Sequence, residues 1–383
     1  MKTLDKTKTV GIMSLPLHTN YGGILQAYAL QEALKRLGNK VYIIDSENKK
    51  KPSRLEMLKR YTKRSIQKYL LRKNVEIFRE KRIKEEYPIV AQHTNKFIES
   101  YFKNIVHLEK IKADKSFALD AIVVGSDQIW RPRYYYAIEN AYLDFVKDRE
   151  LRRISYAPSF GTDAWEYSEA QTQLCKSLLG KFDNVSVRED SAVQMVKKNF
   201  GRDAVHVLDP TMLLQPEDYL KVVGQVDNKY SGSGITYVLD NSGEKKEILD
   251  EVSARIGLSF SPLNVQIGDN GPDVTSRIAP PVENWLQGFA EADFVITDSF
   301  HASVFSILFN KPFIVVANKT RGTSRMSSLL KMFGLEDRLV ENKSDLPTED
   351  LKAIDWEIVN AKLDSLRAQS INFLSNAVAG KSE

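Results

Sequence analysis

Short, nearly continuous apolar runs alternate with helical patterns along this chain of 383 residues, and no other sequence feature constrains the fold as strongly. Strands that are apolar throughout are buried on both faces, as in a parallel sheet covered by helices on each side. The runs that predict strands are 9–13, 41–45, 121–124, 154–157, 185–187, 205–208, 235–239, 294–296 and 313–316. Helical patterns lie at 24–37, 169–179, 191–201, 245–256, 282–292 and 356–378. The sequence therefore predicts an α/β protein with doubly wound parallel sheets.

The chain is longer than one hydrophobic core normally organises, so we expect two α/β domains. A polar, glycine-rich stretch at 226–234, or the slightly earlier Asp209-Pro210 turn, marks the junction. We assign 1–212 to an N-terminal Rossmann-like domain, 213–345 to a C-terminal Rossmann-like domain and 346–383 to a helical tail. Two such domains that face one another bind ligands in the central cleft, at the carboxyl ends of their strands.

Composition and charge limit the kind of partner. Hydrophobic residues make up 42% of the chain and charged residues 27%, as in a soluble globular protein. The net charge of +5 favours anionic ligands and does not require nucleic acid. The single cysteine, Cys175, permits neither an internal disulfide nor a cysteine-based metal site. The N-terminus lacks a signal-peptide core, and no run of about 18 apolar residues occurs, so we expect a cytoplasmic protein.

Residues 49–86 differ in kind from the rest of the first domain. Lysine and arginine dominate this stretch, and apolar side chains such as Leu55, Leu58, Ile66 and Leu70 lie among them. One interpretation is a solvated pair of helices packed on the sheet, within a helical insertion that spans 49–110. The other is a basic amphipathic face that contacts an anionic membrane or a lipid-linked substrate at the inner face of the plasma membrane.

The segment 297–303, with the sequence Thr-Asp-Ser-Phe-His-Ala-Ser, carries the clearest chemical signal. It predicts the end of a buried strand, a tight polar turn with Ser299, and a helix whose first turn carries His301. A helix N-terminus presents free backbone N–H groups to anions, and a histidine there moves protons near neutral pH. Lys319 and Arg321 follow the next strand and are expected at the same edge of the sheet. Together these residues predict a site for a phosphate-bearing substrate.

The first strand-to-helix turn contains Asn20, Gly22 and Gly23. Two glycines let the backbone approach a ligand closely, and the helix behind them offers its N-terminus. The alternative is a tight turn with structural glycines. The turn has neither the Gly-Lys-Ser/Thr ending of a Walker loop nor the Gly-x-Gly-x-x-Gly pattern of a dinucleotide site. The histidines and carboxylates show no metal-ligand spacing, so we expect no metal.

Two further strand ends carry candidate residues. Ser126 and Asp127 follow a buried strand, and Asp127 fits a base or a carboxylate that binds hydroxyl groups. Trp130 fits a ring that stacks on a sugar; alternatively, Asp127 caps a turn and Trp130 fills the core. Arg188 ends the strand at 185–187, where its planar guanidinium suits a carboxylate or phosphate, unless it pairs with the acidic residues that follow it.

In their order along the chain, four motifs together resemble the polysaccharide pyruvyl transferase family. They are Gly125-Ser126-Asp127-Gln128, Ser186-Val187-Arg188-Glu189, Asp209-Pro210-Thr211 and Thr297-Asp298-Ser299-Phe300-His301. The resemblance extends over most of the chain and implies two Rossmann-like domains facing a central cleft, as in GT-B glycosyltransferases. It implies phosphoenolpyruvate as donor on the C-terminal domain and a sugar diol as acceptor on the N-terminal domain. It implies no cofactor.

The resemblance also implies roles for individual residues. His301 matches the family's functional histidine and Arg188 its donor-binding arginine, while the basic residue after the next strand is either Lys319 or Arg321. The family's first loop often reads Asn-x-Gly-Asp, whereas this chain has Asn20-Tyr21-Gly22-Gly23. Because that carboxylate is missing, Asp127 becomes the better candidate for acid–base chemistry.

The expected function is therefore transfer of pyruvate from phosphoenolpyruvate to a sugar or lipid-linked oligosaccharide, as a ketal, in cell-surface or capsular glycan biosynthesis. A nucleotide-sugar-dependent GT-B glycosyltransferase is the main alternative, but no clear carboxylate follows the His301 helix to hold a ribose. A catalytically silent, lectin-like partner in glycan assembly is a third interpretation. It differs from the others because it binds sugar without turning over a donor.

Overall fold

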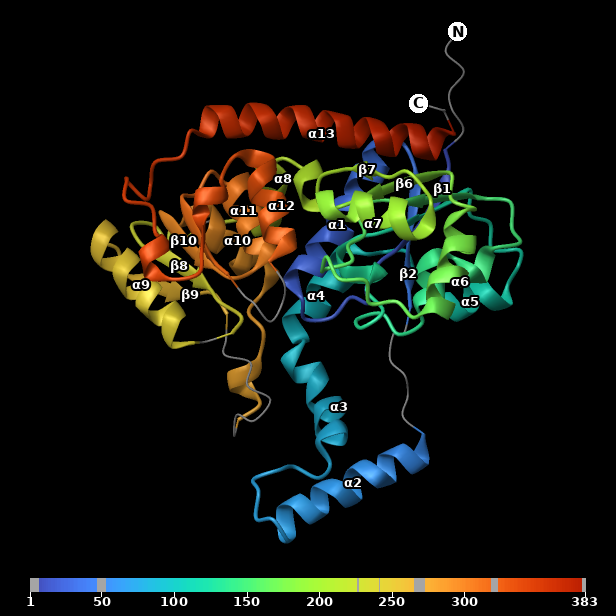
Figure 1. The fold of residues 1–383 in the computed structure, drawn as a ribbon, viewed down its shortest axis with the longest axis horizontal. Helices are drawn as coiled ribbons and strands as arrows, with labels where there is room; N and C mark the ends of the chain where they lie inside the picture. The colour runs from blue at the N-terminus through green and yellow to red at the C-terminus, as the bar shows by residue number, and fades with distance from the viewer. Residues whose placement is uncertain are drawn as a thin grey trace.

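The structure is a computed structural model that describes residues 7–46, 53–225, 227–240, 242–264, 273–317 and 323–380. Two parallel sheets, each flanked by helices, lie next to one another in the molecule (Figure 1). The α/β class and the doubly wound architecture expected from the sequence are confirmed.

The first sheet has seven parallel strands in the order β3-β2-β1-β4-β5-β6-β7. They are β1 (Thr9–Met13), β2 (Lys40–Asp45), β3 (Ile105–His107), β4 (Ala121–Val124), β5 (Arg152–Ser155), β6 (Asn184–Val187) and β7 (Val205–His206). Its helices are α1 (Tyr21–Arg36), α5 (Leu108–Ala113), α6 (Glu169–Leu179) and α7 (Asp190–Phe200). The strand order reverses between β1 and β4, which is where doubly wound sheets bind ligands.

The second sheet has five parallel strands in the order β12-β11-β10-β8-β9. They are β8 (Gly234–Tyr237), β9 (Phe260–Pro262), β10 (Phe294–Thr297), β11 (Phe313–Val316) and β12 (Leu339–Val340). Its helices are α9 (Gly243–Ile256), α10 (Val282–Glu291), α11 (Phe300–Leu308) and α12 (Ser324–Phe333). Here the strand order reverses between β8 and β10, so the loops after these strands are the second expected ligand-binding edge.

Local sequence signals explain where several of these elements begin and end. Every residue of β4, β10 and β11 is buried, as expected for strands covered by helices on both faces. Helix α6 begins with a capping box in which Ser168 and Gln171 satisfy each other's backbone N–H groups. Helix α7 ends at Gly201, whose φ of +69° suits glycine.

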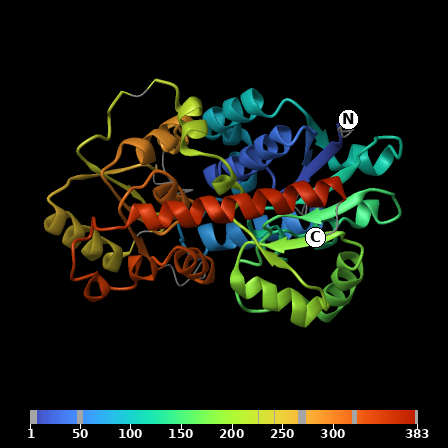
Figure 2. The ribbon, with the colours of Figure 1, turned by 90° about the horizontal axis from the view of Figure 1, so that it is seen from above.

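The two halves share one hydrophobic core that contains side chains from both sheets. Tyr21 on α1 stacks on Trp285 of α10 with ring centroids 5.6 Å apart, and its hydroxyl donates to the carbonyl of Pro280 at 2.7 Å. Helix α8 (Pro216–Val223) connects the halves, and α13 (Trp356–Ala379) runs along the length of the molecule above both (Figure 2). The domain boundaries at 212 and 345 stay a prediction.

Helix α13 returns to the first half of the chain and is fixed there by hydrogen bonds. The Arg152 guanidinium donates to the carbonyl of Ala377 at 2.6 Å, and Leu208 N–H donates to the hydroxyl of Ser370 at 3.1 Å. Buried side chains of α13, including Phe373 and Leu374, pack into the shared core. The last helix therefore packs against the body of the protein along much of its length.

Between β2 and β3 the chain forms α2 (Arg54–Tyr69), α3 (Arg79–Val90) and α4 (Gln92–Tyr101). Helix α4 packs on the body through the buried Thr94 and Phe97. Helix α2 does not pack on the sheet, contrary to the first interpretation of this region. None of its residues is buried, and it lies apart from both sheets at the far end of α3 (Figure 1). No helix in the part of the chain described here is both long and apolar enough to cross a membrane.

Candidate active site

A cavity of ≈ 380 Å³ lies between the two sheets, at the edges where both strand orders reverse. The loop after β1 contributes Thr19, Asn20 and Gly22, and the segment after β4 contributes Asp127 and Gln128. From the second half come Tyr237, Leu239, Trp285, Asp298, Ser299, Phe300, His301, Arg325 and Met326. The cavity therefore lies in the interdomain cleft that the sequence predicts.

Three helices begin at this cavity. The first turns of α1, α11 and α12 supply Gly22, His301 and Arg325 to its wall. None of these three first turns contains an acidic side chain. Because a helix N-terminus carries partial positive charge, three uncompensated N-termini make the cavity suited to an anion.

His301 is held at the centre of the site by packing against Gly22. A Cβ atom at Gly22 would lie 2.0 Å from Nδ1 of His301, so only glycine leaves room for the imidazole. Nε2 of His301 lies 3.8 Å from Oδ2 of Asp209. This nitrogen is buried and has no hydrogen-bond partner among the residues that the structure describes. A buried polar atom without a partner is typical of a group that acts on a ligand.

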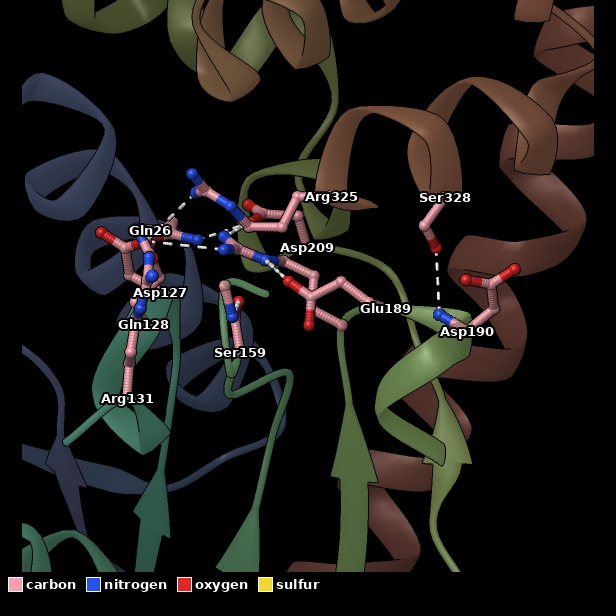
Figure 3. Close-up of polar contacts among 12 residues, drawn as sticks. Gln26, Asp127, Gln128, Arg131, Ser159, Glu189, Asp190, Asp209, Arg325 and Ser328 are labelled. Atoms are coloured by element: carbon pink, nitrogen blue, oxygen red, sulfur yellow. Dashed lines mark hydrogen bonds and ion pairs between the residues drawn. The ribbon is translucent and has the colours of Figure 1, made fainter. Parts of the chain in front are cut away.

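A buried group of titratable side chains, here called the cleft cluster, lies at this cavity, and Figure 3 shows Asp127, Glu189, Asp209 and Arg325 of it close together. Its members are Asp127, Arg188, Glu189, Asp209, His301 and Arg325.

Arg188 connects the carboxylates of the cleft cluster. Its guanidinium donates to Asp209 at 2.9 Å and lies 3.5 Å from both Asp127 and Glu189. The other oxygen of Asp209 accepts hydrogen bonds from the backbone and hydroxyl of Thr211 at 3.0 and 2.7 Å. The Arg188 side chain is 1% exposed, and it faces these carboxylates rather than the cavity, although its Nε has no hydrogen-bond partner among the described residues.

Arg325 is the cation of the cleft cluster that reaches the cavity. Its side chain is 13% exposed, and it forms a long ion pair with Asp127, at 4.0 Å. Its Nε has no hydrogen-bond partner among those residues. The ring of Phe300 lies between the two arginines, 4.4 Å from the Arg188 guanidinium and 5.9 Å from that of Arg325. Arg325 is thus a buried cation whose counter-charge is incomplete, which favours binding of an anion.

Burial lowers the pKa of the His301 imidazole below its usual range. The carboxylates of Asp209 and Asp127 oppose this shift, and the cations of Arg188 and Arg325 add to it. The imidazole is therefore mainly neutral at neutral pH.

The two carboxylates that face His301 have lowered pKa values. Burial opposes ionisation of Asp127, but Arg188, His301 and Arg325 outweigh it and lower its pKa. For Asp209, burial is outweighed by His301, Arg188 and the hydrogen bonds from Thr211, and its pKa is also lowered. Both carboxylates are therefore ionised at neutral pH.

Of the residues predicted for the site, five line the cavity, namely His301, Asp127, Ser299, Asn20 and Gly22. Gly23 and Ser126 do not line it: a Cβ at Gly23 would meet the Asn20 side chain at 3.3 Å, and Ser126 is buried behind Asp127. Lys319 and Arg321 lie outside the described residues.

The prediction that Trp130 stacks on a sugar is wrong. Its ring is completely buried, stacks on Tyr142 at 5.0 Å and donates from the indole nitrogen to the carbonyl of Ala141. Trp130 therefore fills the core, which was the alternative interpretation. Arg188 is also not at the open cleft edge, because the carboxylates around it bury it completely.

Sequence reasoning missed Arg325 and underrated Asp209 and Gln26. The amide of Gln26 donates to Asp209 at 2.5 Å from the middle of α1, where no motif signals a polar site residue. Asp209 was treated as a turn residue, although it follows a strand end as Asp127 does. Arg325 is in the first turn of α12, and a helix beginning after β11 was the signal that could have found it.

Two facing doubly wound domains with the site between them define the GT-B architecture, which this chain shares. A putative UDP-N-acetylglucosamine 2-epimerase from Listeria monocytogenes superimposes with a TM-score of 0.50 at 11% identity, over 98% of this chain and 92% of that one. This likeness concerns the fold alone. UGT89C1 of Arabidopsis thaliana gives a TM-score of 0.49 at 11% identity, over 98% of this chain and 99% of that one.

The chain belongs to the polysaccharide pyruvyl transferase family, whose model matches residues 20–320. The matched range contains the turn with Asn20 and Gly22, both switch-point edges and the His301 helix. No curated protein sequence matches the chain significantly.

Proposed function

We propose that this protein transfers pyruvate from phosphoenolpyruvate to two hydroxyl groups of a sugar, forming a ketal and releasing phosphate, in the synthesis of a cell-surface or capsular glycan. The observation that carries the proposal is the buried His301, whose Nε2 has no partner among the described residues, in a cavity at three helix N-termini, within a chain of the pyruvyl transferase family. Phosphoenolpyruvate brings a phosphate and a carboxylate, and three helix N-termini together with Arg325 match such a donor.

The donor-binding role moves from Arg188 to Arg325 in this proposal. Arg188 already serves Asp209, Asp127 and Glu189, and it has no exposed surface to offer a ligand. Arg325 lines the cavity, and its Nε lacks a partner among the described residues. Arg188 is then a positioning residue, since it orients the two carboxylates that face His301.

Ketal formation requires one proton to be added at C3 and one to be removed from each of two hydroxyl groups, and the site offers an acid and a base for these steps. One sugar hydroxyl adds to C2 of the donor as C3 gains a proton, so that the methylene becomes a methyl group. The second hydroxyl then displaces phosphate from C2, and its proton leaves with the phosphate or through the base. We assign the proton that reaches C3 to His301 and the removal of hydroxyl protons to the ionised Asp127.

The lowered pKa of His301 fits this order of events. A bound dianionic phosphate and a carboxylate would add negative charge beside the imidazole, and negative charge raises a histidine pKa. The donor itself would therefore favour the protonated imidazole that the first step uses.

The direct test is incubation of the purified protein with phosphoenolpyruvate and a panel of glycans, with phosphate release and product mass as readouts. We expect phosphate release that depends on the acceptor, together with a product heavier by one pyruvate less water. Release of a nucleoside diphosphate from a sugar nucleotide, with no turnover of phosphoenolpyruvate, would establish the glycosyltransferase alternative instead. Glycan binding with neither donor turned over would establish the lectin-like alternative.

The role of Arg325 is tested by the Arg325→Gln variant. A charge-assisted contact is worth about 1.5–3 kcal/mol, so KM for phosphoenolpyruvate should rise about 10- to 100-fold. Lys331→Gln is the matched control, because Lys331 is on the same helix but pairs with Asp190 at the surface. An unchanged KM in Arg325→Gln would remove this residue from the donor site.

A further inference from the structure

Helix α2 carries a ridge of apolar side chains that nothing in the described structure covers. Leu55, Leu58, Ile66, Tyr69 and Leu70 are between 47% and 76% exposed. With 3.6 residues per turn, these positions fall within one stripe along the helix. Large apolar side chains exposed singly are ordinary, but a continuous stripe of them marks a binding surface.

The ridge points away from the rest of the protein. On the opposite side of α2, the ring of Tyr61 packs against Phe78 with centroids 5.0 Å apart. From that side Arg64 also makes a two-pronged ion pair with Glu80, at 2.5 and 2.9 Å. These contacts fix one face of α2 to the start of α3 and leave the apolar ridge turned outward.

The ridge is bordered by positive charge. Helix α2 contains Arg54, Lys59, Arg60, Lys63, Arg64 and Lys68 against a single acidic residue, Glu56. Lys59 and Lys63 lie next to the ridge, where they line a groove together with Leu58 and Ile66. Neither lysine forms an ion pair with another residue in the described parts of the chain.

The positive charge of α2 distinguishes between two surfaces that could cover this ridge, namely a second copy of the helix and an anionic bilayer. A second copy of α2 would bring two strongly basic faces together, and like charges in contact oppose association. An anionic bilayer offers hydrocarbon for the ridge and negative headgroups for the lysines beside it. We propose that the α2 ridge, with Lys59 and Lys63, docks on an anionic lipid surface as an interfacial helix.

The helix that carries α2 leads to the cavity. Helix α3 has 12 residues and is therefore about 18 Å long. Near its other end, Tyr87 contacts His18 at 3.2 Å, in the loop that supplies Thr19 and Asn20 to the cavity wall. Glu86 pairs with Arg277 of the second half at 2.6 Å. This arrangement would present a lipid-linked acceptor to the cleft, a statement that rests on the proposed function. The proposal that α2 binds a lipid surface does not depend on that function.

Vesicle co-sedimentation of the full chain tests the proposal without any turnover. We expect binding to phosphatidylcholine vesicles that contain phosphatidylglycerol, weak binding to phosphatidylcholine alone, and loss of binding as salt rises. Leu58→Gln/Ile66→Gln should weaken binding at least about 100-fold, since each buried leucine-sized side chain contributes strongly. Lys59→Gln/Lys63→Gln should weaken it about 30-fold. All four substitutions are at unburied positions.

The controls are exposed residues of the same kinds elsewhere. Ile358→Gln removes an apolar side chain that is 63% exposed on α13, and Lys198→Gln/Lys362→Gln removes two exposed charges. Vesicle binding that is absent in the parental protein, or equal in the α2 and control variants, would overturn the proposal. A dimer in sedimentation velocity that is lost in Leu58→Gln/Ile66→Gln would overturn it too, because a second copy would then cover the ridge.

The experiments distinguish failure of the proposed function from failure of the lipid-binding proposal. If the protein does not turn over phosphoenolpyruvate but binds anionic vesicles through α2, the lipid-binding proposal is supported and the proposed function is wrong. If it forms ketals on soluble glycans but does not bind vesicles, the proposed function is supported and the lipid-binding proposal is wrong. Where the parental protein forms ketals on a soluble acceptor, the α2 variants should keep that activity.

Discussion

Basic side chains gather in two regions of this protein, and the two regions hold them in opposite ways. In the cleft cluster, Arg188 is 1% exposed and contacts three carboxylates, so its charge is compensated inside the protein. On α2, Lys59 and Lys63 extend from a helix with no buried residue and form no ion pair within the described structure. The first arrangement fixes protonation states for chemistry, and the second leaves charge available to another surface.

This difference predicts which substitutions change the activity and the stability of the protein. A buried charge whose partner is removed becomes uncompensated, which destabilises the fold and changes neighbouring pKa values. An exposed lysine interacts through water and salt, so its loss hardly changes the stability of the fold. Substitution of the arginines or carboxylates of the cleft cluster should therefore lower both activity and stability, whereas substitution of the α2 lysines should change neither.

The largest expected effect is on turnover in His301→Gln. Loss of a general acid usually lowers the rate about 10²- to 10⁴-fold, and kcat should fall by that factor. His107→Gln is the control, since His107 is largely exposed at the edge of the first sheet. Thermal unfolding of both variants should match the parental protein within a few degrees. Near-parental kcat in a folded His301→Gln protein would contradict the assignment.

The next largest effect should come from Gly22→Ala, which changes no chemical group. The added Cβ would collide with the His301 ring, and a displacement of about 1 Å can lower a rate about 10²-fold. Gly23→Ala is the matched control, because its Cβ would meet only the Asn20 side chain at 3.3 Å. Steady-state kinetics on the two variants should therefore differ strongly. Equal activities would show that His301 does not need its present position.

Substitutions in the two basic regions should change the free energy of unfolding by different amounts. Removal of one partner from a buried ion pair costs about 3–5 kcal/mol, and Arg188→Met leaves Asp209 and Asp127 short of their main cation. Lys59→Gln/Lys63→Gln should change the free energy of unfolding by no more than about 0.5 kcal/mol. Chemical denaturation measures both values. A small loss in Arg188→Met would mean that water or neighbouring side chains compensate the cluster.

The smallest expected effect is a shift in the pKa of His301. Because burial lowers the His301 pKa, its imidazole should titrate below pH 6.5 in NMR spectra of the free protein. Bound inorganic phosphate adds negative charge and should raise that pKa, so the protonated form persists to higher pH. If His301 must donate a proton, kcat falls as pH rises through the raised pKa of the complex. A free-protein pKa at or above 6.5 would contradict the effect of burial.

The fold could be predicted from the sequence because its signals are local and repeated. Uninterrupted apolar runs such as 121–124 and 313–316 matched buried parallel strands to the residue. Because doubly wound sheets bind ligands at the carboxyl ends of their strands, Asp127, Ser299 and His301 were expected at the cleft, and they line the cavity.

The rest depended on packing that no local pattern encodes. Arg188 and Arg325 are both close to strand ends, yet only Arg325 reaches the cavity, because Asp209 and Glu189 close over Arg188. Trp130 follows Asp127 by three residues, yet a neighbouring tyrosine ring holds it in the core. Whether α2 packs on the sheet could not be read from its amphipathic pattern, since a ridge that meets the sheet and one that meets a lipid look alike.

The seating of His301 on Gly22 has a consequence for how the two halves must be held. The imidazole belongs to the half with five strands, whereas the glycine and Asp127 belong to the half with seven. A rotation that parted the two halves would therefore separate the imidazole from Asp127 and divide the cavity wall into two incomplete surfaces. Under the proposed function, a complete site requires the present arrangement of the halves, and their shared hydrophobic core stabilises it.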